Sequence, residues 1–192
     1  MAYELVVVGC SWGGLAALGR LLDHLPEDVD LPIVVAQHRG PDSLRGVLEA
    51  TLRRRRPRPV VEVEDKDPIA PGRVYLAPPD YHLLVEPGSF ALSVDEHVQY
   101  ARPSIDVLFE SAADAYGARV IGVVLTGANA DGAAGLARIA ERGGAAIVQD
   151  PSRSLRRAMP DAAIAATTAD AVLPLEEIGN FLFGLCCGTV RV

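Results

Sequence analysis

Residues 5–14, Leu-Val-Val-Val-Gly-Cys-Ser-Trp-Gly-Gly, decide the fold of this chain. The first part of this stretch is a short apolar, β-branched run, and glycines surround the serine that follows it. Residues 15–25 then repeat leucines at helical spacing. The pattern predicts a buried strand, a tight turn and an amphipathic helix, which is the opening unit of an α/β fold.

The same alternation of strand and helix continues toward both ends of the chain. Because the predicted strands are apolar throughout and do not alternate with polar residues, they are typical of a parallel sheet that is covered on both faces. We expect further strands at 33–36, 120–125, 145–149 and 171–173, and helices at 43–55, from about 131, around 162–166 and at 175–183.

The middle of the chain departs from this alternation. Short apolar runs at 61–63, 74–77, 82–85 and 90–94 are separated by turn residues, among them Pro78-Pro79-Asp80 and Pro87-Gly88-Ser89. This spacing predicts antiparallel hairpins inserted into the α/β framework. With no internal repeat or linker, we expect residues 1–192 to form one domain. Its fold would be a doubly wound, mostly parallel sheet with helices on both faces and an inserted antiparallel hairpin region.

Composition excludes several classes of protein. The 192 residues are 49% hydrophobic and 22% charged, as in an ordinary globular protein. With 25 acidic and 18 basic side chains the formal net charge is -7, which argues against nucleic-acid binding through bulk electrostatics. Three cysteines without metal-ligand spacing predict no zinc site and favour a reducing cytoplasm. The N-terminus lacks the basic region of a signal peptide and its first apolar run ends at Gly9, and no apolar stretch approaches the ~18 residues needed for membrane insertion.

The turn after the first predicted strand carries the strongest chemical signal. A dinucleotide site would need glycine at the position of Ser11, so that backbone approaches a pyrophosphate, and a side chain there counts against such a cofactor. Gly9-Cys10-Ser11-Trp12-Gly13 instead matches the G-x-S-x-G nucleophile elbow, in which a strand-to-helix turn projects a serine hydroxyl. The alternative is a turn in which the serine only caps the helix.

Two further residues follow predicted strands. His38 comes directly after the second apolar run, whereas His24, His82 and His97 lie in a helix end, a hairpin and a charged loop and are expected at the surface. Asp131 follows the strand at 120–125; its alternative role is that of a helix N-terminal acid. Because functional groups of parallel sheets gather at the carboxyl ends of the strands, Ser11, His38 and Asp131 are expected to converge as a triad.

These motifs and several others resemble the catalytic domain of the chemotaxis receptor protein-glutamate methylesterases. The matching pieces occur in family order and cover nearly the whole chain: 9–14, 37–38, 74–83, 102–109, 125–133, 149–150 and 158–160. The resemblance implies that Ser11 is the nucleophile, His38 the general base and Asp131 its partner. Backbone N–H groups, including that of Trp12, would hold the oxyanion, and Gly13 and Ala128 would belong to the same oxyanion site and pocket.

The resemblance also implies a function and its setting. The expected reaction is hydrolysis of glutamyl methyl esters on the helical cytoplasmic region of chemoreceptor-like proteins, with deamidation of glutamine as a side activity. It requires no metal and no cofactor. Two-domain members carry a receiver domain for which this chain leaves no room, so regulation is expected from a separate response regulator. The basic run at 53–56 is either a solvated face or a contact for acidic receptor helices.

Two departures from the family pattern leave alternatives open. Ala128 and Asn129 stand where the family usually has methionine and glycine, and Trp12 stands where a smaller residue usually follows the nucleophile. These changes lie beside the predicted triad. An esterase or amidase with another substrate therefore remains an alternative, as does a binding module in which the triad has no catalytic function.

Overall fold

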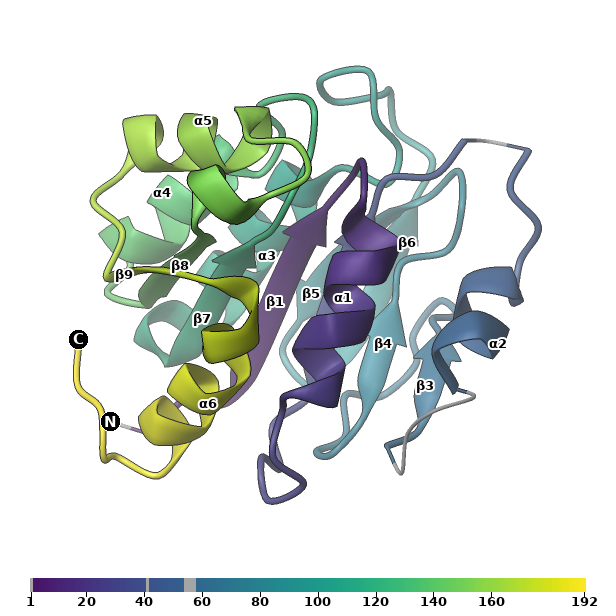
Figure 1. Ribbon diagram of the computed structural model, residues 1–192. Coiled ribbons are helices and arrows are strands. Elements are labelled where there is room, and N and C mark those ends of the chain that lie inside the picture. The colour runs from purple at the N-terminus through teal and green to yellow at the C-terminus, as the bar shows by residue number, and fades with distance from the viewer. Residues whose placement is uncertain (1, 41, 54–57) are drawn as a thin grey trace.

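A seven-stranded, fully parallel sheet forms the centre of the protein (Figure 1). The computed structural model describes residues 2–40, 42–53 and 58–192. The strand order is β3-β4-β2-β1-β7-β8-β9. The strands are β1 (Leu5–Cys10), β2 (Ile33–Gln37), β3 (Val60–Glu62), β4 (Val74–Leu76), β7 (Val120–Val124), β8 (Ala145–Gln149) and β9 (Ala171–Leu173).

Strand β1 lies between β2 and β7, where the order of strands along the sheet reverses. Every residue of β1 is buried, because helices cover both faces of the sheet. Open α/β sheets place their sites outside the carboxyl ends of the strands at such a reversal. The residues that follow β1, β2 and β7 therefore lie where a functional site is expected.

Helices form a layer on each side of the sheet. Apolar residues of α1, α2 and α6 share one buried cluster with one face of the strands, and those of α3, α4 and α5 share a second cluster with the other face. The helices are α1 (Gly14–Asp23), α2 (Val47–Arg53), α3 (Ile105–Tyr116), α4 (Ala133–Glu141), α5 (Ala158–Ala166) and α6 (Leu175–Cys186). The predicted doubly wound architecture is confirmed.

The hairpin region is smaller than predicted. Strands β5 (His82–Glu86) and β6 (Ser89–Ser93) form an antiparallel pair that packs on α3, as expected. The prediction was wrong for β3 and β4, which pair in parallel and extend the main sheet. The apolar runs at 61–63 and 74–77 are too short to indicate the direction of pairing. Helix α2 begins at Val47, four residues later than predicted, and the predicted helix and basic run beyond Arg53 largely fall outside the described residues.

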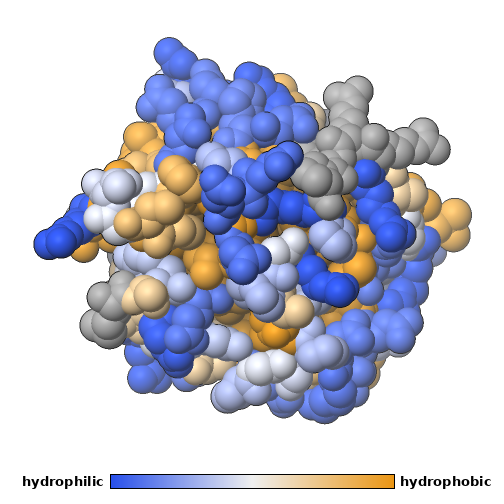
Figure 2. Space-filling model, turned by 90° about the horizontal axis from the view of Figure 1, so that it is seen from below, coloured by the Kyte–Doolittle hydropathy of each residue, from blue (hydrophilic) through white to orange (hydrophobic). Residues whose placement is uncertain are grey.

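Polar side chains cover most of the surface at the lower side of Figure 1. Hydrophobic residues show there between the hydrophilic ones and at the left and right edges of the view (Figure 2). Within the described residues, no helix is both long and apolar enough to cross a bilayer.

Candidate active site

Ser11 lies in the turn between β1 and α1. Its N–H donates to the carbonyl of Thr126 at 3.0 Å, and its own carbonyl accepts the N–H of Gly14 at 2.8 Å. Gly13 has a φ of 79°, a conformation that favours glycine, and it is the N-cap residue of α1. Among the described residues, the N–H groups of Trp12 and Gly13 have no hydrogen-bond acceptor. The turn therefore presents a serine hydroxyl together with two unpaired donors.

Gln37 joins this turn to the end of β2. Its side-chain Nε2 donates to the carbonyls of Ser11 and His38, at 3.0 Å each. Its Oε1 accepts from the thiol of Cys10 at 3.0 Å. Burial raises the pKa of that thiol to about 12, so Cys10 stays protonated as the donor. Gln37 was included in a stretch of sequence that resembles the family but was assigned no role, although an amide at the end of an apolar strand was the available signal.

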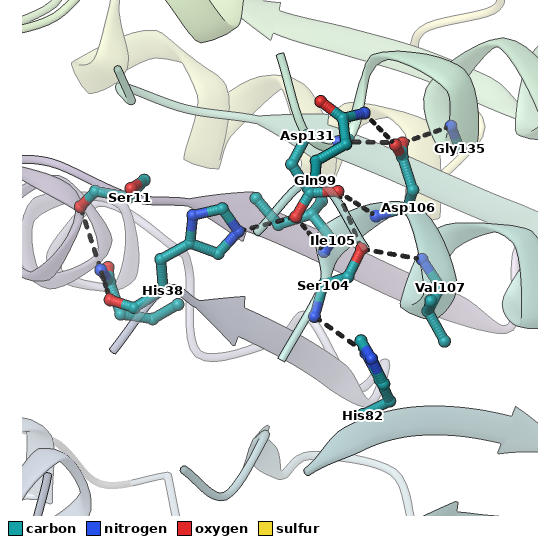
Figure 3. Close-up of polar contacts among 12 residues, drawn as sticks. Ser11, His38, His82, Gln99, Ser104, Ile105, Asp106, Val107, Asp131 and Gly135 are labelled. Atoms are coloured by element: carbon teal, nitrogen blue, oxygen red, sulfur yellow. Dashed lines mark hydrogen bonds and ion pairs between the residues drawn. The ribbon is translucent and has the colours of Figure 1, made fainter. Parts of the chain in front are cut away.

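His38 contacts Asp131 directly. The distance from His38 Nε2 to Asp131 Oδ2 is 2.7 Å, and the side chains are 13% and 0% exposed. Figure 3 shows the imidazole between the Ser11 turn and this carboxylate, with its second ring nitrogen on the Ser11 side. Within the described part of the chain, no hydrogen bond joins the Ser11 hydroxyl to His38. The structure thus brings His38 and Asp131 into contact and leaves Ser11 beside them.

Asp131 is held by the start of α3. Besides His38, its carboxylate accepts from the Ser104 hydroxyl at 2.8 Å and from the N–H groups of Ile105 and Asp106 at 2.7 and 3.0 Å. These are the first N–H groups of a helix, which lack partners within it. Burial alone would raise the pKa of Asp131, but the hydrogen bonds from His38, Asp106 and Ile105 lower it below the ordinary value. The carboxylate is therefore kept ionised.

A second buried carboxylate makes the reciprocal contact. Asp106 in α3 accepts from the N–H groups of Gly132 and Gly135 at the start of α4, at 2.9 and 2.7 Å. Its other oxygen accepts from Gln99 at 2.8 Å. Burial, with the nearby charge of Asp131, raises the pKa of Asp106 to about 6. The two aspartates thus cap each other's neighbouring helices, which locks the Asp131 loop against α3.

The other histidines differ in position. His24 and His97 are exposed, as predicted. The prediction that His82 lies at the surface was wrong: it is 2% exposed. Its Nδ1 accepts the N–H of Ser104 at 3.2 Å, and its Nε2 donates to the carbonyl of Glu96 at 3.0 Å. His82 therefore supports the residue that contacts Asp131. In the described ranges, no group of three His, Cys, Asp or Glu side chains is placed to bind a metal.

An open cleft of about 740 Å³ lies beside the serine turn. It is lined by Trp12, Ala128 and residues of the segment 151–158. Trp12 is 60% exposed. Trp12 and Ala128, the residues predicted to border the nucleophile, therefore both line this cleft, and its volume is sufficient for a polypeptide side chain.

Comparisons with known proteins identify the family of this chain. Residues 6–182 match the CheB methylesterase family. The chain is 46% identical over 186 residues to a putative protein-glutamate methylesterase/protein-glutamine glutaminase of Leptospira interrogans, covering 96% of each chain. It is 40% identical to the protein-glutamate methylesterase FrzG of Myxococcus xanthus, over 94% of this chain and 54% of that protein.

A comparison with a solved structure points to the same family. The CheB methylesterase catalytic domain of Thermotoga maritima superposes with a TM-score of 0.89 at 33% identity, covering 96% of this chain and 100% of that one. This chain belongs to the CheB methylesterase family.

Proposed function

We propose that this protein is a serine hydrolase that removes methyl esters from glutamyl side chains of chemoreceptor-like proteins and also deamidates glutamine. The observation that carries the proposal is the 2.7 Å contact between His38 and the buried carboxylate of Asp131, next to the serine turn. The names of the relatives from Leptospira and Myxococcus support the substrate class.

The contact with Asp131 supports Nδ1 of His38 as the proposed base. Because Nε2 donates to Asp131, Nδ1 is the nitrogen left to take the proton of Ser11. The serine oxygen then attacks the ester carbonyl. In this proposal the N–H groups of Trp12 and Gly13, which have no acceptor among the described residues, bind the oxyanion, and the Asp131 carboxylate stabilises the imidazolium.

Collapse of the tetrahedral intermediate breaks the bond to the methoxy oxygen. His38 returns its proton to that oxygen, methanol leaves, and the glutamyl group remains as an ester of Ser11. Water then attacks this ester while giving its proton to His38, and the free carboxylate and Ser11 hydroxyl are regenerated. With a glutamine side chain the same steps release ammonia. These steps use protein groups and water.

Two measurements test the proposal. A fluorophosphonate probe should label Ser11 in the wild type and leave Ser11→Ala unlabelled. Methanol release from a methylated receptor cytoplasmic fragment should follow the same pattern. Labelling without methanol release would favour an esterase or amidase of another substrate. Absence of labelling in folded protein would favour a binding module.

We further propose that residues 1–192 act in the cytoplasm as a single catalytic domain and that a separate response regulator controls it. Free thiols at Cys186 and Cys187 fit a reducing compartment. The purified chain should release methanol at the same rate with and without acetyl phosphate. Stimulation by acetyl phosphate would reveal a phosphorylation site in this chain and contradict the proposal.

A further inference from the structure

We propose that Arg156, held over the indole of Trp12, binds a carboxylate of the substrate polypeptide close to the scissile ester. The enzyme would then prefer methylated glutamates that have a second acidic side chain about one helical turn away. This inference rests on the proposed function, because it assigns the part of the substrate that lies beside the reacting ester.

The backbone of Arg156 is fixed to the serine turn. The Thr126 hydroxyl accepts the N–H of Arg156 at 2.8 Å and lies 3.0 Å from the carbonyl of Trp12. The carbonyl of Arg156 accepts the N–H of Gly127 at 3.1 Å, while the carbonyl of Thr126 accepts the N–H of Ser11 at 3.0 Å. Thr126 and Gly127, which follow β7, therefore join the segment of Arg156 to the turn that carries Ser11.

The side chain of Arg156 contacts an aromatic ring. Its guanidinium carbon lies 5.4 Å from the centre of the Trp12 ring, within the range of a cation–π interaction. Because Trp12 directly follows Ser11, this contact holds a positive charge beside the nucleophile. Both side chains are exposed and line the 740 Å³ cleft.

Arg156 differs from the arginines next to it. Arg153 pairs with Glu176 at 3.3 Å, and Arg157 pairs with Asp161 through two contacts at 2.6 and 3.2 Å. Among the described residues, Arg156 has no carboxylate partner. Its guanidinium donors therefore remain available for an anion from outside the chain, and an arginine fork matches a carboxylate in geometry.

The proposed reaction explains why a carboxylate would lie near the ester in the substrate. Its product is a glutamate, so a polypeptide that is methylated at several glutamates also carries free carboxylates in the same region. On a helix, side chains three or four residues apart lie on one face with about 5–6 Å between their Cβ atoms. A methyl ester near Ser11 and a carboxylate near Arg156 would then reach the cleft from one helix face.

The test uses two synthetic helical peptides with one glutamyl methyl ester. One peptide has glutamate at the positions three and four residues to either side of the ester, and the other has alanine there. For the wild type, kcat/KM for methanol release should be about five- to tenfold higher with the glutamate peptide, mainly through a lower KM. Arg156→Ala should abolish this preference. Arg156→Glu should instead prefer a third peptide with lysine at the same positions.

Arg153→Ala is the matched control, because it removes an arginine of the same segment that is already ion-paired. It should retain the wild-type preference. Raising the salt concentration should reduce the preference of the wild type, since the contact is exposed. An equal rate on both peptides, or an unchanged preference in Arg156→Ala, would overturn the subsite and leave the methylesterase proposal standing. Failure of the wild type to hydrolyse either peptide would instead count against the proposed function itself.

Discussion

Replacement of Asp131 by alanine should affect both stability and catalysis, because the same carboxylate orients His38 and caps α3. It accepts four hydrogen bonds, from His38, Ser104, Ile105 and Asp106. After truncation, His38 is partly exposed and can bond to water, and the Ser104 hydroxyl can rotate. The backbone N–H groups of Ile105 and Asp106 have no such alternative and stay buried.

The loss of stability follows from these two N–H groups. A buried donor without an acceptor costs about 1–3 kcal/mol. Because removal of the buried charge also relieves its desolvation, we expect a net loss of about 3 kcal/mol. For a protein of this size that corresponds to a melting temperature lower by roughly 6–12 °C. Asp131→Asn keeps one acceptor oxygen and should lose about half as much stability.

The loss of activity should be larger in relative terms. Without the carboxylate, the imidazolium formed in the transition state has no anionic partner, and His38 no longer has a fixed tautomer. We expect kcat/KM for methanol release to fall about 10³-fold or more in Asp131→Ala, at a temperature where the variant is folded.

Ser104→Ala provides the control that separates the two effects. It removes one hydrogen bond to Asp131 and the cap on the N–H of Val107, but it does not contact His38. Thermal unfolding should show a loss of about 1 kcal/mol, with activity within about fivefold of the wild type. Two results would refute the assignment of both a structural and a catalytic role to Asp131. One is a melting temperature of Asp131→Ala within 1 °C of the wild type, or about 0.3 kcal/mol, and the other is an activity of Asp131→Ala of a tenth or more of the wild-type activity.

Three further changes test the site and its surroundings. Ser11→Ala should remove most methanol release while the melting temperature stays close to that of the wild type, and adding His38→Ala should lower the residual rate little, because the two groups act as a unit. Asp106→Asn tests the raised pKa of about 6. Because ionisation of this buried carboxyl destabilises the fold, the contribution of Asp106 to the free energy of unfolding should fall as the pH rises from about 4 to 6. Urea unfolding across that range should show that the variant lacks this decline, and identical pH profiles would contradict the assignment. Iodoacetamide should modify exposed Cys187 and leave buried Cys10 unmodified until the protein unfolds; rapid labelling of Cys10 in native protein would disprove its burial.

The sequence by itself determined the central strands of the main sheet and the edge at which the candidate site lies. Fully apolar runs at β1, β2, β7 and β8 indicated strands buried on both faces, because a strand with one wet face would alternate. The positions of Ser11, His38 and Asp131 after three of these strands then placed them at one edge. These inferences depend on the local sequence pattern, because a long run of apolar residues is a reliable sign that a strand is buried on both faces.

The tertiary structure decided which distant groups become partners. Local sequence suggested that Asp131 caps its own helix, but its carboxylate accepts N–H groups of α3, which lie 25 and 26 residues earlier. The burial of His82 and the cation–π contact of Trp12 with Arg156 likewise join segments far apart in the chain. Hydrogen-bond donors and charges of this kind leave no periodic pattern along the sequence. Their pairing is set by how the helices pack on the sheet.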